Sequence, residues 1–183
     1  MQVREVLIAA AGMLGRTDIA CFLKRGIGSD LNALEGEIEA LLRCYNLVET
    51  EVALHYRPLR RIETLRSADG KIHYSRLSKR PVKVEKVTKD GVSVPFAMLV
   101  ETLQTASGEV EILYRYAPEH KTEDGESEFS AGELRALALG VACEYSLCAG
   151  LYEQAVTWDR RYRDELSALC RPRSGQMPAG RWI

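Results

Sequence analysis

Residues 30–56 read DLNALEGEIEALLRCYNLVETEVALHY, and this stretch decides how the chain is built. Its apolar residues alternate at spacings of three and four, which is the pattern of an amphipathic helix. We therefore predict one long helix from Asp30 to about Tyr56. Pro58 ends it, because the residue before a proline is pushed out of the helical region. The apolar positions are Leu31, Leu34, Ile38, Leu41, Tyr45, Val48 and Val52.

This apolar seam has two interpretations. It packs either against other helices of the same chain or against another copy of the chain. A seam of only about three heptads favours packing within the chain, and it leaves the oligomer seam open as the alternative.

After the long helix, the period of the apolar residues changes from helical to strand-like. Val110, Ile112 and Tyr114 alternate with Glu111, Leu113 and Arg115, as in a strand with one face on a core. Asp69-Gly70, Asp90-Gly91 and Ser107-Gly108 are turn signals, and the second is a strong hairpin signal. We expect a small antiparallel β unit of about five or six strands.

Helical patterns flank this unit on both sides. A short helix is predicted over Val3–Leu14 and a second after Thr17. Ser130 and Glu133 form the S-x-x-E capping box that opens a helix. Gly150 separates that helix from a last one, which Pro172 stops.

The predicted fold class is therefore α+β. It is a helical bundle (N-terminal helices, one long helix, a C-terminal helical hairpin) with an inserted small antiparallel β unit and an extended C-terminal tail. Residues 1–58 and 130–170 would form the helical part and residues 59–129 the β domain. Residues 171–183 would form the tail.

The composition is that of an ordinary globular protein, with 46% hydrophobic and 28% charged residues and a net charge of −1 over 183 residues. No apolar run approaches the roughly 20 residues that a membrane helix needs, and no signal-peptide pattern is visible. We expect a protein that is made in a bacterial cytoplasm and has no membrane partner.

No catalytic or metal-binding motif stands out. The sequence has no phosphate-binding loop, no dinucleotide fingerprint and no zinc-protease or nucleophile-elbow pattern. Five cysteines include no C-x-x-C pair, and the three histidines lie apart from them. We expect no catalytic residue, no metal and no cofactor. A small enzyme with an unrecognised site is the remote alternative.

Charge is divided into two opposed blocks. Residues 57–89 hold eleven basic and three acidic side chains, whereas residues 101–133 hold nine acidic and two basic ones. The candidate basic face is Arg57, Arg60, Arg61, Lys79, Arg80 and Lys83. The candidate acidic counter-face is Glu109, Glu111, Glu123, Asp124, Glu126 and Glu128.

Three interpretations of these blocks compete. In the first, opposite charges pair between neighbouring strands of one sheet or are solvated. In the second, the basic face of one subunit meets the acidic face of the next in a head-to-tail ring, or lines its lumen. In the third, the basic residues contact nucleic-acid phosphates, and the chain is a small nucleic-acid-binding module using residues 57–89.

Several short strings carry a resemblance. They lie along the long helix, at the start and end of the strand block, and in the two C-terminal helices. The strings are Leu42-Arg43-Cys44-Tyr45-Asn46-Leu47-Val48, Tyr56-Arg57-Pro58-Leu59, Tyr114-Arg115-Tyr116-Ala117-Pro118, Leu139-Gly140-Val141-Ala142-Cys143-Glu144-Tyr145, Gly150-Leu151-Tyr152-Glu153-Gln154-Ala155, Trp158-Asp159-Arg160-Arg161-Tyr162 and Gly180-Arg181-Trp182-Ile183. With the element order, they resemble head–tail connector (adaptor) proteins of phages and prophages, similar to the tail tubular or gatekeeper proteins of short-tailed phages.

The resemblance implies a structural virion protein of the phage neck. It implies a ring of twelve subunits beneath the portal, with the helical part and the tail docked on the portal protein. The β part would continue the tube towards the next tail or nozzle protein, and the lumen would pass genomic DNA during ejection.

The tail suits such a role. Residues Arg171, Arg173, Arg181, Trp182 and Ile183 are the candidate portal-docking residues, because tryptophan and arginine are typical interface anchors. A frayed terminus is the alternative.

Overall fold

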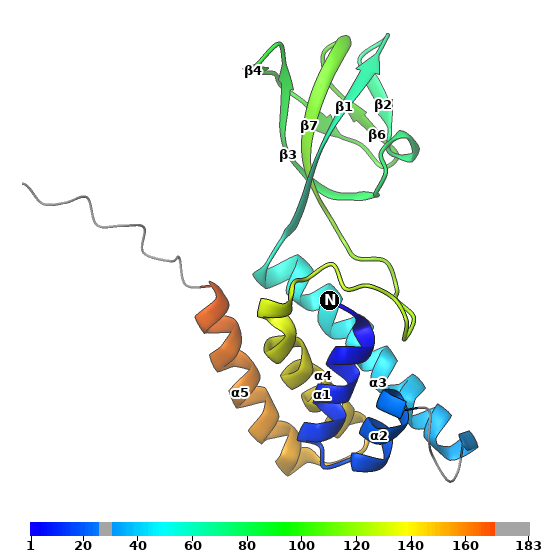
Figure 1. The fold of residues 1–183 in the computed structure, drawn as a ribbon. Helices are drawn as coiled ribbons and strands as arrows, with labels where there is room; N and C mark the ends of the chain where they lie inside the picture. Colours follow the sequence, from blue (N-terminus) through cyan, green and yellow to red (C-terminus); the bar gives the residue numbers. More distant parts are fainter. Residues whose placement is uncertain (26–30, 171–183) are drawn as a thin grey trace, which may run out of the picture. The chain divides into compact units, whose positions relative to one another are not determined.

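The computed structural model describes residues 1–25 and 31–170, with side chains throughout except at residues 31–33 (Figure 1). This described part contains five α-helices and two antiparallel sheets, which confirms the mixed α+β class. The chain divides into two compact units. We call Met1–Val48 with Lys121–Ile183 the helical unit and Glu49–His120 the β unit.

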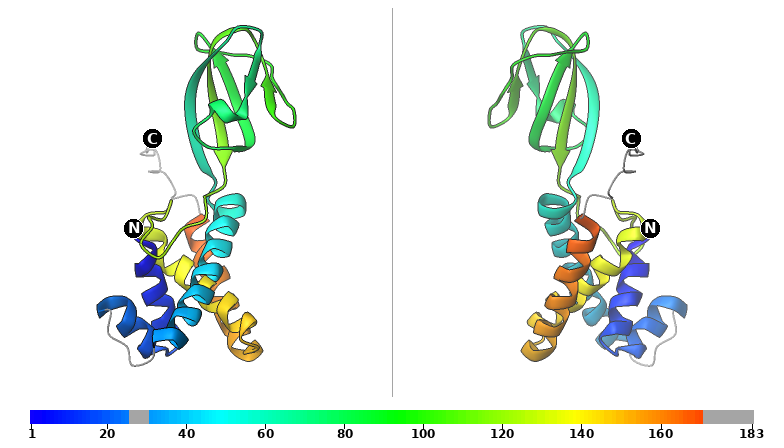
Figure 2. Two further views of the ribbon diagram at one scale, coloured as in Figure 1. Left: turned by 90° about the vertical axis from the view of Figure 1, so that its right-hand side faces the viewer. Right: turned by 90° about the vertical axis from the view of Figure 1, so that its left-hand side faces the viewer.

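In the helical unit, α1 (Val3–Met13) packs against α2 (Thr17–Arg25) and against α4 (Leu134–Cys148), and α4 also packs against α5 (Tyr152–Cys170). Figure 2 shows these helices from two sides. Helix α4 is the centre of this arrangement, because nearly all of its residues from Ala136 to Ser146 are buried.

The predicted long helix is present as α3 (Leu31–Glu51), and a π-helical turn, η1 (Val52–Tyr56), extends it. The apolar seam is buried within the single chain from Leu34 through Tyr45 to Val52, and Leu31 lies outside the described side chains. The interpretation as packing within the chain is therefore confirmed, and these positions are not an open seam for another copy.

Local signals set the ends of α4. Ser130 and Glu133 form the predicted capping box, with the Ser130 backbone N–H donating to the Glu133 carboxylate at 3.0 Å. A single 3₁₀ turn, η3 (Ala131–Glu133), stands between this cap and α4. Gly150, with φ of 73°, follows the helix, and its N–H donates to the Leu147 carbonyl at 3.1 Å.

The acidic loop after His120 packs with the helical unit. The Val3 N–H donates to the Gly125 carbonyl and the Ser127 N–H donates to the Met1 carbonyl. The Asn46 amide donates to the Lys121 carbonyl and accepts from the Lys121 N–H. Residues 121–129 are predicted to belong to the β domain, whereas these bonds hold them to α1 and α3 of the helical unit. The β unit also begins earlier than predicted, at Glu49.

The β unit has two antiparallel sheets. The first has the order β1 (Leu59–Ser67), β7 (Gly108–Tyr116), β3 (Pro81–Lys89), β4 (Val92–Ser93), and the second has the order β2 (Lys71–His73), β6 (Thr102–Gln104), β5 (Ala97–Met98). A 3₁₀ turn, η2 (Tyr74–Arg76), follows β2. The described part therefore holds seven strands rather than five or six, because strands of two or three residues are too short to show a period.

Side chains from both sheets form the core of the β unit. Val110, Ile112 and Tyr114 of β7 are fully buried, as the alternation predicts, and they pack with Ile72 and Leu103 of the second sheet. The two sheets thus lie face to face, and the other side of the first sheet forms the outer face of the unit.

The Asp90-Gly91 hairpin is confirmed. Both residues have positive φ, 51° and 79°, and they join β3 to β4 with Lys89 opposite Val92. Positive φ at both central positions is the type I′ geometry that matches the twist of the flanking strands. Across the described residues, no helix combines the length and the apolar character needed to cross a membrane.

Candidate functional site

The described residues hold no cluster suited to a metal ion. The three histidines are exposed and stand on separate segments. Burial raises the pKa of the Cys44 thiol to about 12, and its neighbour Cys148 adds to that rise. The thiol is therefore protonated near neutral pH and is not an activated nucleophile.

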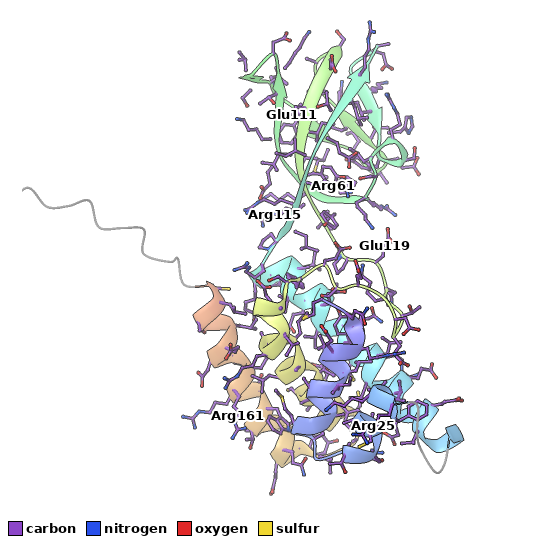
Figure 3. The ribbon with its side chains drawn as sticks, viewed as in Figure 1. Arg25, Arg61, Glu111, Arg115, Glu119 and Arg161 are labelled. Carbon is purple, nitrogen blue, oxygen red and sulfur yellow. The ribbon has the colours of Figure 1, made fainter. Side chains whose placement is uncertain are left out.

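The candidate basic residues do not form one face. Arg60 and Arg61 are adjacent in β1, so their side chains leave opposite faces of the sheet. Arg60 Nε lies 2.8 Å from a Glu85 carboxylate oxygen on the outer face, and Arg115 of β7 pairs with the same carboxylate. Arg61 instead pairs with Glu63, at 3.1 Å. Arg61 and Arg115 are labelled in Figure 3.

These pairs hold the carboxylates in their charged form. The hydrogen bond from Arg60 lowers the pKa of Glu85 below its ordinary value; burial opposes this shift, and Arg115 reinforces it. Burial alone would raise the pKa of Glu63, but hydrogen bonds from Ser78 and Tyr114 bring it below the ordinary value. Glu85 of β3 on the outer face and Glu63 of β1 on the inner face are each held by neighbouring hydrogen-bond donors.

The other four basic candidates are dispersed. Lys79 Nζ lies 3.0 Å from a carboxylate oxygen of Glu119, which Figure 3 labels. Arg57, Arg80 and Lys83 are exposed, Arg57 before β1 and Lys83 within β3.

The acidic candidates are divided between the units. Glu109 and Glu111 are exposed on β7, opposite Arg66 and Thr64 of β1, respectively. The other four lie in the loop of the helical unit. There Arg4 pairs with Glu123 and Asp124, and Lys121 pairs with Glu128 at 3.0 Å.

At least half of the twelve candidate charged residues thus form ion pairs with a residue of their own unit. The β unit holds twelve Lys and Arg residues and ten Asp and Glu residues. Arg115 and Glu85 pair between the neighbouring strands β7 and β3, as the first interpretation expects, whereas Arg61 and Glu63 lie on one strand.

The β unit exposes an apolar hairpin tip. Leu99, Val100 and Glu101, between β5 and β6, form this hairpin tip, and Val100 is 86% exposed. Three hydrogen bonds hold it. The Tyr74 hydroxyl donates to the Leu99 carbonyl at 2.9 Å, the Tyr74 N–H to the Glu101 carbonyl at 3.0 Å, and the Leu99 N–H to the Thr102 carbonyl at 2.8 Å.

A shallow hollow of about 500 Å³ adjoins the hairpin tip. Val100 and Glu101 of the tip line it together with His73, Tyr74, Leu77 and Arg80. The hairpin tip is therefore an apolar projection held by hydrogen bonds, and it lies beside a hollow that the cationic side chain of Arg80 lines.

The outer face of the first sheet has an apolar pair in a charged setting. Ile62 of β1 lies directly opposite Leu113 of β7, and Ile62 is 59% exposed. Because directly paired residues share a face, Ile62 and Leu113 form one patch, which we call the outer-face pair. Glu111, labelled in Figure 3, is two residues along β7 on the same face.

The helical unit exposes apolar side chains where α4 meets α5. Leu147, Leu151, Tyr152 and Val156 form this helical corner, and Tyr152 and Val156 are 68% and 71% exposed. The side chain of Leu151, which precedes α5, is 43% exposed.

None of these three surfaces was predicted as a site. One signal was available for the hairpin tip, since the run from Phe96 to Val100 is continuously apolar within a segment that otherwise alternates. The outer-face pair has no such signal, because which residues share a face across two strands depends on their register.

The candidate tail residues Arg171, Arg173, Arg181, Trp182 and Ile183 lie outside the described residues. No family model matches the sequence, and comparison with curated proteins gives no match.

Proposed function

We propose that this chain is a structural, ring-forming subunit of the neck of a tailed phage or prophage. It docks beneath the portal, joins head to tail and provides a channel for DNA. The proposal includes the finer architecture, a helical bundle that carries an inserted β unit and an extended C-terminal tail. It also includes a virion location and the resemblance to tail tubular proteins.

One observation carries the proposal beyond the resemblance: each unit exposes an apolar surface of its own. The helical corner and the hairpin tip present side chains that a solitary soluble protein would cover or replace by polar ones. A neck subunit needs contacts both to the portal and to its own copies, so separate apolar surfaces suit that role.

The helical corner is the surface that we assign to the portal, together with the tail. Tyr152 and Val156 stand one helical turn apart on α5 and project from the same side of that helix. An exposed aromatic beside an aliphatic residue is a typical anchor for a partner's pocket.

Copy-number measurement by mass spectrometry on purified particles of the source phage tests the proposal. We expect the chain in intact particles at the same stoichiometry as the portal protein. Absence from intact particles would remove the chain from the neck.

Binding to purified portal protein tests the docking surface. Tyr152→Glu and removal of residues 171–183 should each weaken binding by at least about tenfold while leaving the far-ultraviolet circular dichroism spectrum unchanged. The matched control is Thr157→Glu, an exposed α5 position outside the corner. Equal portal binding by all four proteins would mean that another surface docks.

A further inference from the structure

Two of the cysteines lie together in the helical unit, one on α3 and one on α4. The thiols of Cys44 and Cys148 are hydrogen-bonded to each other, and neither is part of a disulfide. They differ in their access to solvent, because Cys44 is only 3% exposed whereas Cys148 is an exposed residue. The pair therefore has one thiol that a reagent in solution can reach and one that its neighbour can reach.

The packing of α3 against α4 explains why these thiols meet. A methyl group on Gly140 of α4 would lie 2.6 Å from Val48 Cγ1 of α3, so the two helices approach closely at this point. Cys44 stands one helical turn before Val48, and Cys148 stands about two turns after Gly140. The two cysteines thus continue the contact line that the close approach begins.

We propose that Cys44 and Cys148 form a reversible disulfide that joins α3 to α4 when the chain meets a low-molecular-weight disulfide such as oxidised glutathione. The reducing interior of a cell keeps such a pair as thiols, and an oxidising exterior lets the bond form. This inference goes beyond the proposed neck function and does not depend on it, because it concerns two side chains of one copy.

The other three cysteines are placed differently. The Cys143 thiol donates to the Ala155 carbonyl at 3.6 Å, so it is directed at α5. Cys21 is an exposed residue of α2, and Cys170 is the exposed last residue of α5. The structure therefore selects one pair among the five cysteines of the chain.

The exchange takes two steps. Cys148 loses its proton to water, and the thiolate attacks one sulfur of oxidised glutathione, so that a mixed disulfide forms and one glutathione thiolate leaves. The sulfur of Cys44 then attacks the Cys148 sulfur, the bond to glutathione breaks, and the second glutathione leaves with the proton of Cys44. Overall the two cysteines lose two electrons and two protons, and one glutathione disulfide is reduced to two thiols.

The second step needs a thiol that is buried and protonated near neutral pH. Its target sulfur is its own hydrogen-bond neighbour, so the attack is intramolecular and benefits from a high effective concentration. The mixed disulfide also removes the charge on Cys148 that helps to raise the pKa of Cys44. Cys148 is thus the entry point, and Cys44 resolves the mixed disulfide.

Peptide mapping by mass spectrometry on the full-length chain tests the pair, after treatment with oxidised glutathione and alkylation of the remaining thiols. We expect a peptide that links Cys44 to Cys148 as the main product, and dithiothreitol should release the link. Because the bond closes a loop of about 100 residues, the midpoint of thermal unfolding should rise by about 5–15 °C. A linked peptide with an unchanged midpoint would overturn the joining of α3 to α4.

Variants separate the two roles. Cys148→Ser, at an exposed position, should leave Cys44 unmodified in the folded chain, whereas Cys44→Ser should stop at a stable glutathione adduct on Cys148. The matched control is Cys21→Ser, which removes another exposed thiol and should form the link at the unaltered rate. Circular dichroism confirms that each variant folds. The pair is wrong if the unaltered chain also stops at the Cys148 adduct, or if Cys148 links to Cys21 or Cys170 instead.

Discussion

Gly140 of α4 lies where three helices meet. A methyl group there would come within 2.6 Å of Val48 Cγ1 and within 3.0 Å of the Tyr162 ring. Neither side chain can move easily, because both are buried. The absence of a side chain is thus what lets α3 and α5 both approach α4.

We expect Gly140→Ala to lower the free energy of unfolding by about 1–3 kcal/mol, because the added methyl group overpacks the core. Gly12→Ala is the matched control. Gly12 is also helical, and nothing lies within 4 Å of its added methyl group. This variant should stabilise the chain by about 0.5–1 kcal/mol. Urea denaturation measures both values, and a stabilising Gly140→Ala would contradict the close approach.

Tyr145 links three elements through its hydroxyl. It donates a short hydrogen bond to Glu37 of α3 and accepts one of 3.1 Å from Arg16, which precedes α2. Burial, with a further contribution from Glu37, raises the pKa of Tyr145 to about 12, from an ordinary value of 10.0. The folded state thus favours the neutral phenol.

The pH dependence of stability follows from this shift. The folded pKa is raised, so the contribution is fully present below pH 10 and is lost as the pH rises through about 12. We expect Tyr145→Phe to be less stable by about 1 kcal/mol at pH 8 and to show a smaller decrease in stability between these pH values. Denaturant titrations at a series of pH values measure this, and identical slopes would contradict it.

At the scale of single elements, local sequence signals set several boundaries. The capping box opens α4, Gly150 follows it, and the Asp90-Gly91 turn joins β3 to β4. Each signal acts within about four residues, which is why each could be predicted from the sequence.

We expect Ser130→Ala to lower the free energy of unfolding by about 1 kcal/mol, because the backbone N–H of Gly132 loses its acceptor. Ser130→Thr keeps a hydroxyl that both accepts from Gly132 and donates to Glu133, and it should lose much less. Thermal or urea unfolding compares the two variants. Equal losses would show that the hydrogen bond at the cap adds no stability beyond that of the neighbouring buried side chain, Phe129.

At the scale of the whole molecule, the charges of the β unit oppose the nucleic-acid alternative. Three of the basic side chains between residues 57 and 89 that the sequence singled out are held by Glu85, Glu63 and Glu119. Salt-dependent binding to duplex DNA needs several cations that are free to meet phosphates along one face.

We therefore expect no measurable binding of the full-length chain to duplex DNA at about 150 mM salt. At that salt concentration, proteins that bind DNA non-specifically reach roughly micromolar affinity. Fluorescence anisotropy with a labelled duplex measures this. Tight binding that weakens when Arg80 and Lys83 are replaced by Ala would favour the nucleic-acid-binding module instead.

The sequence by itself determined the features that depend on near neighbours along the chain. These include the α+β class, the long helix with its buried seam, the capping box and the Asp90-Gly91 hairpin. Periodicity and turn chemistry are local properties, so they can be read from one sequence.

Only the tertiary structure decided which distant residues meet. It placed the acidic loop on α1 and α3, set Arg60 and Arg115 on one carboxylate, and brought Ile62 opposite Leu113. Such contacts depend on strand register and on packing between segments far apart in the chain, which no local pattern encodes. The exposed apolar surfaces are also of this kind, because the packing of the core decides which apolar side chains stay exposed.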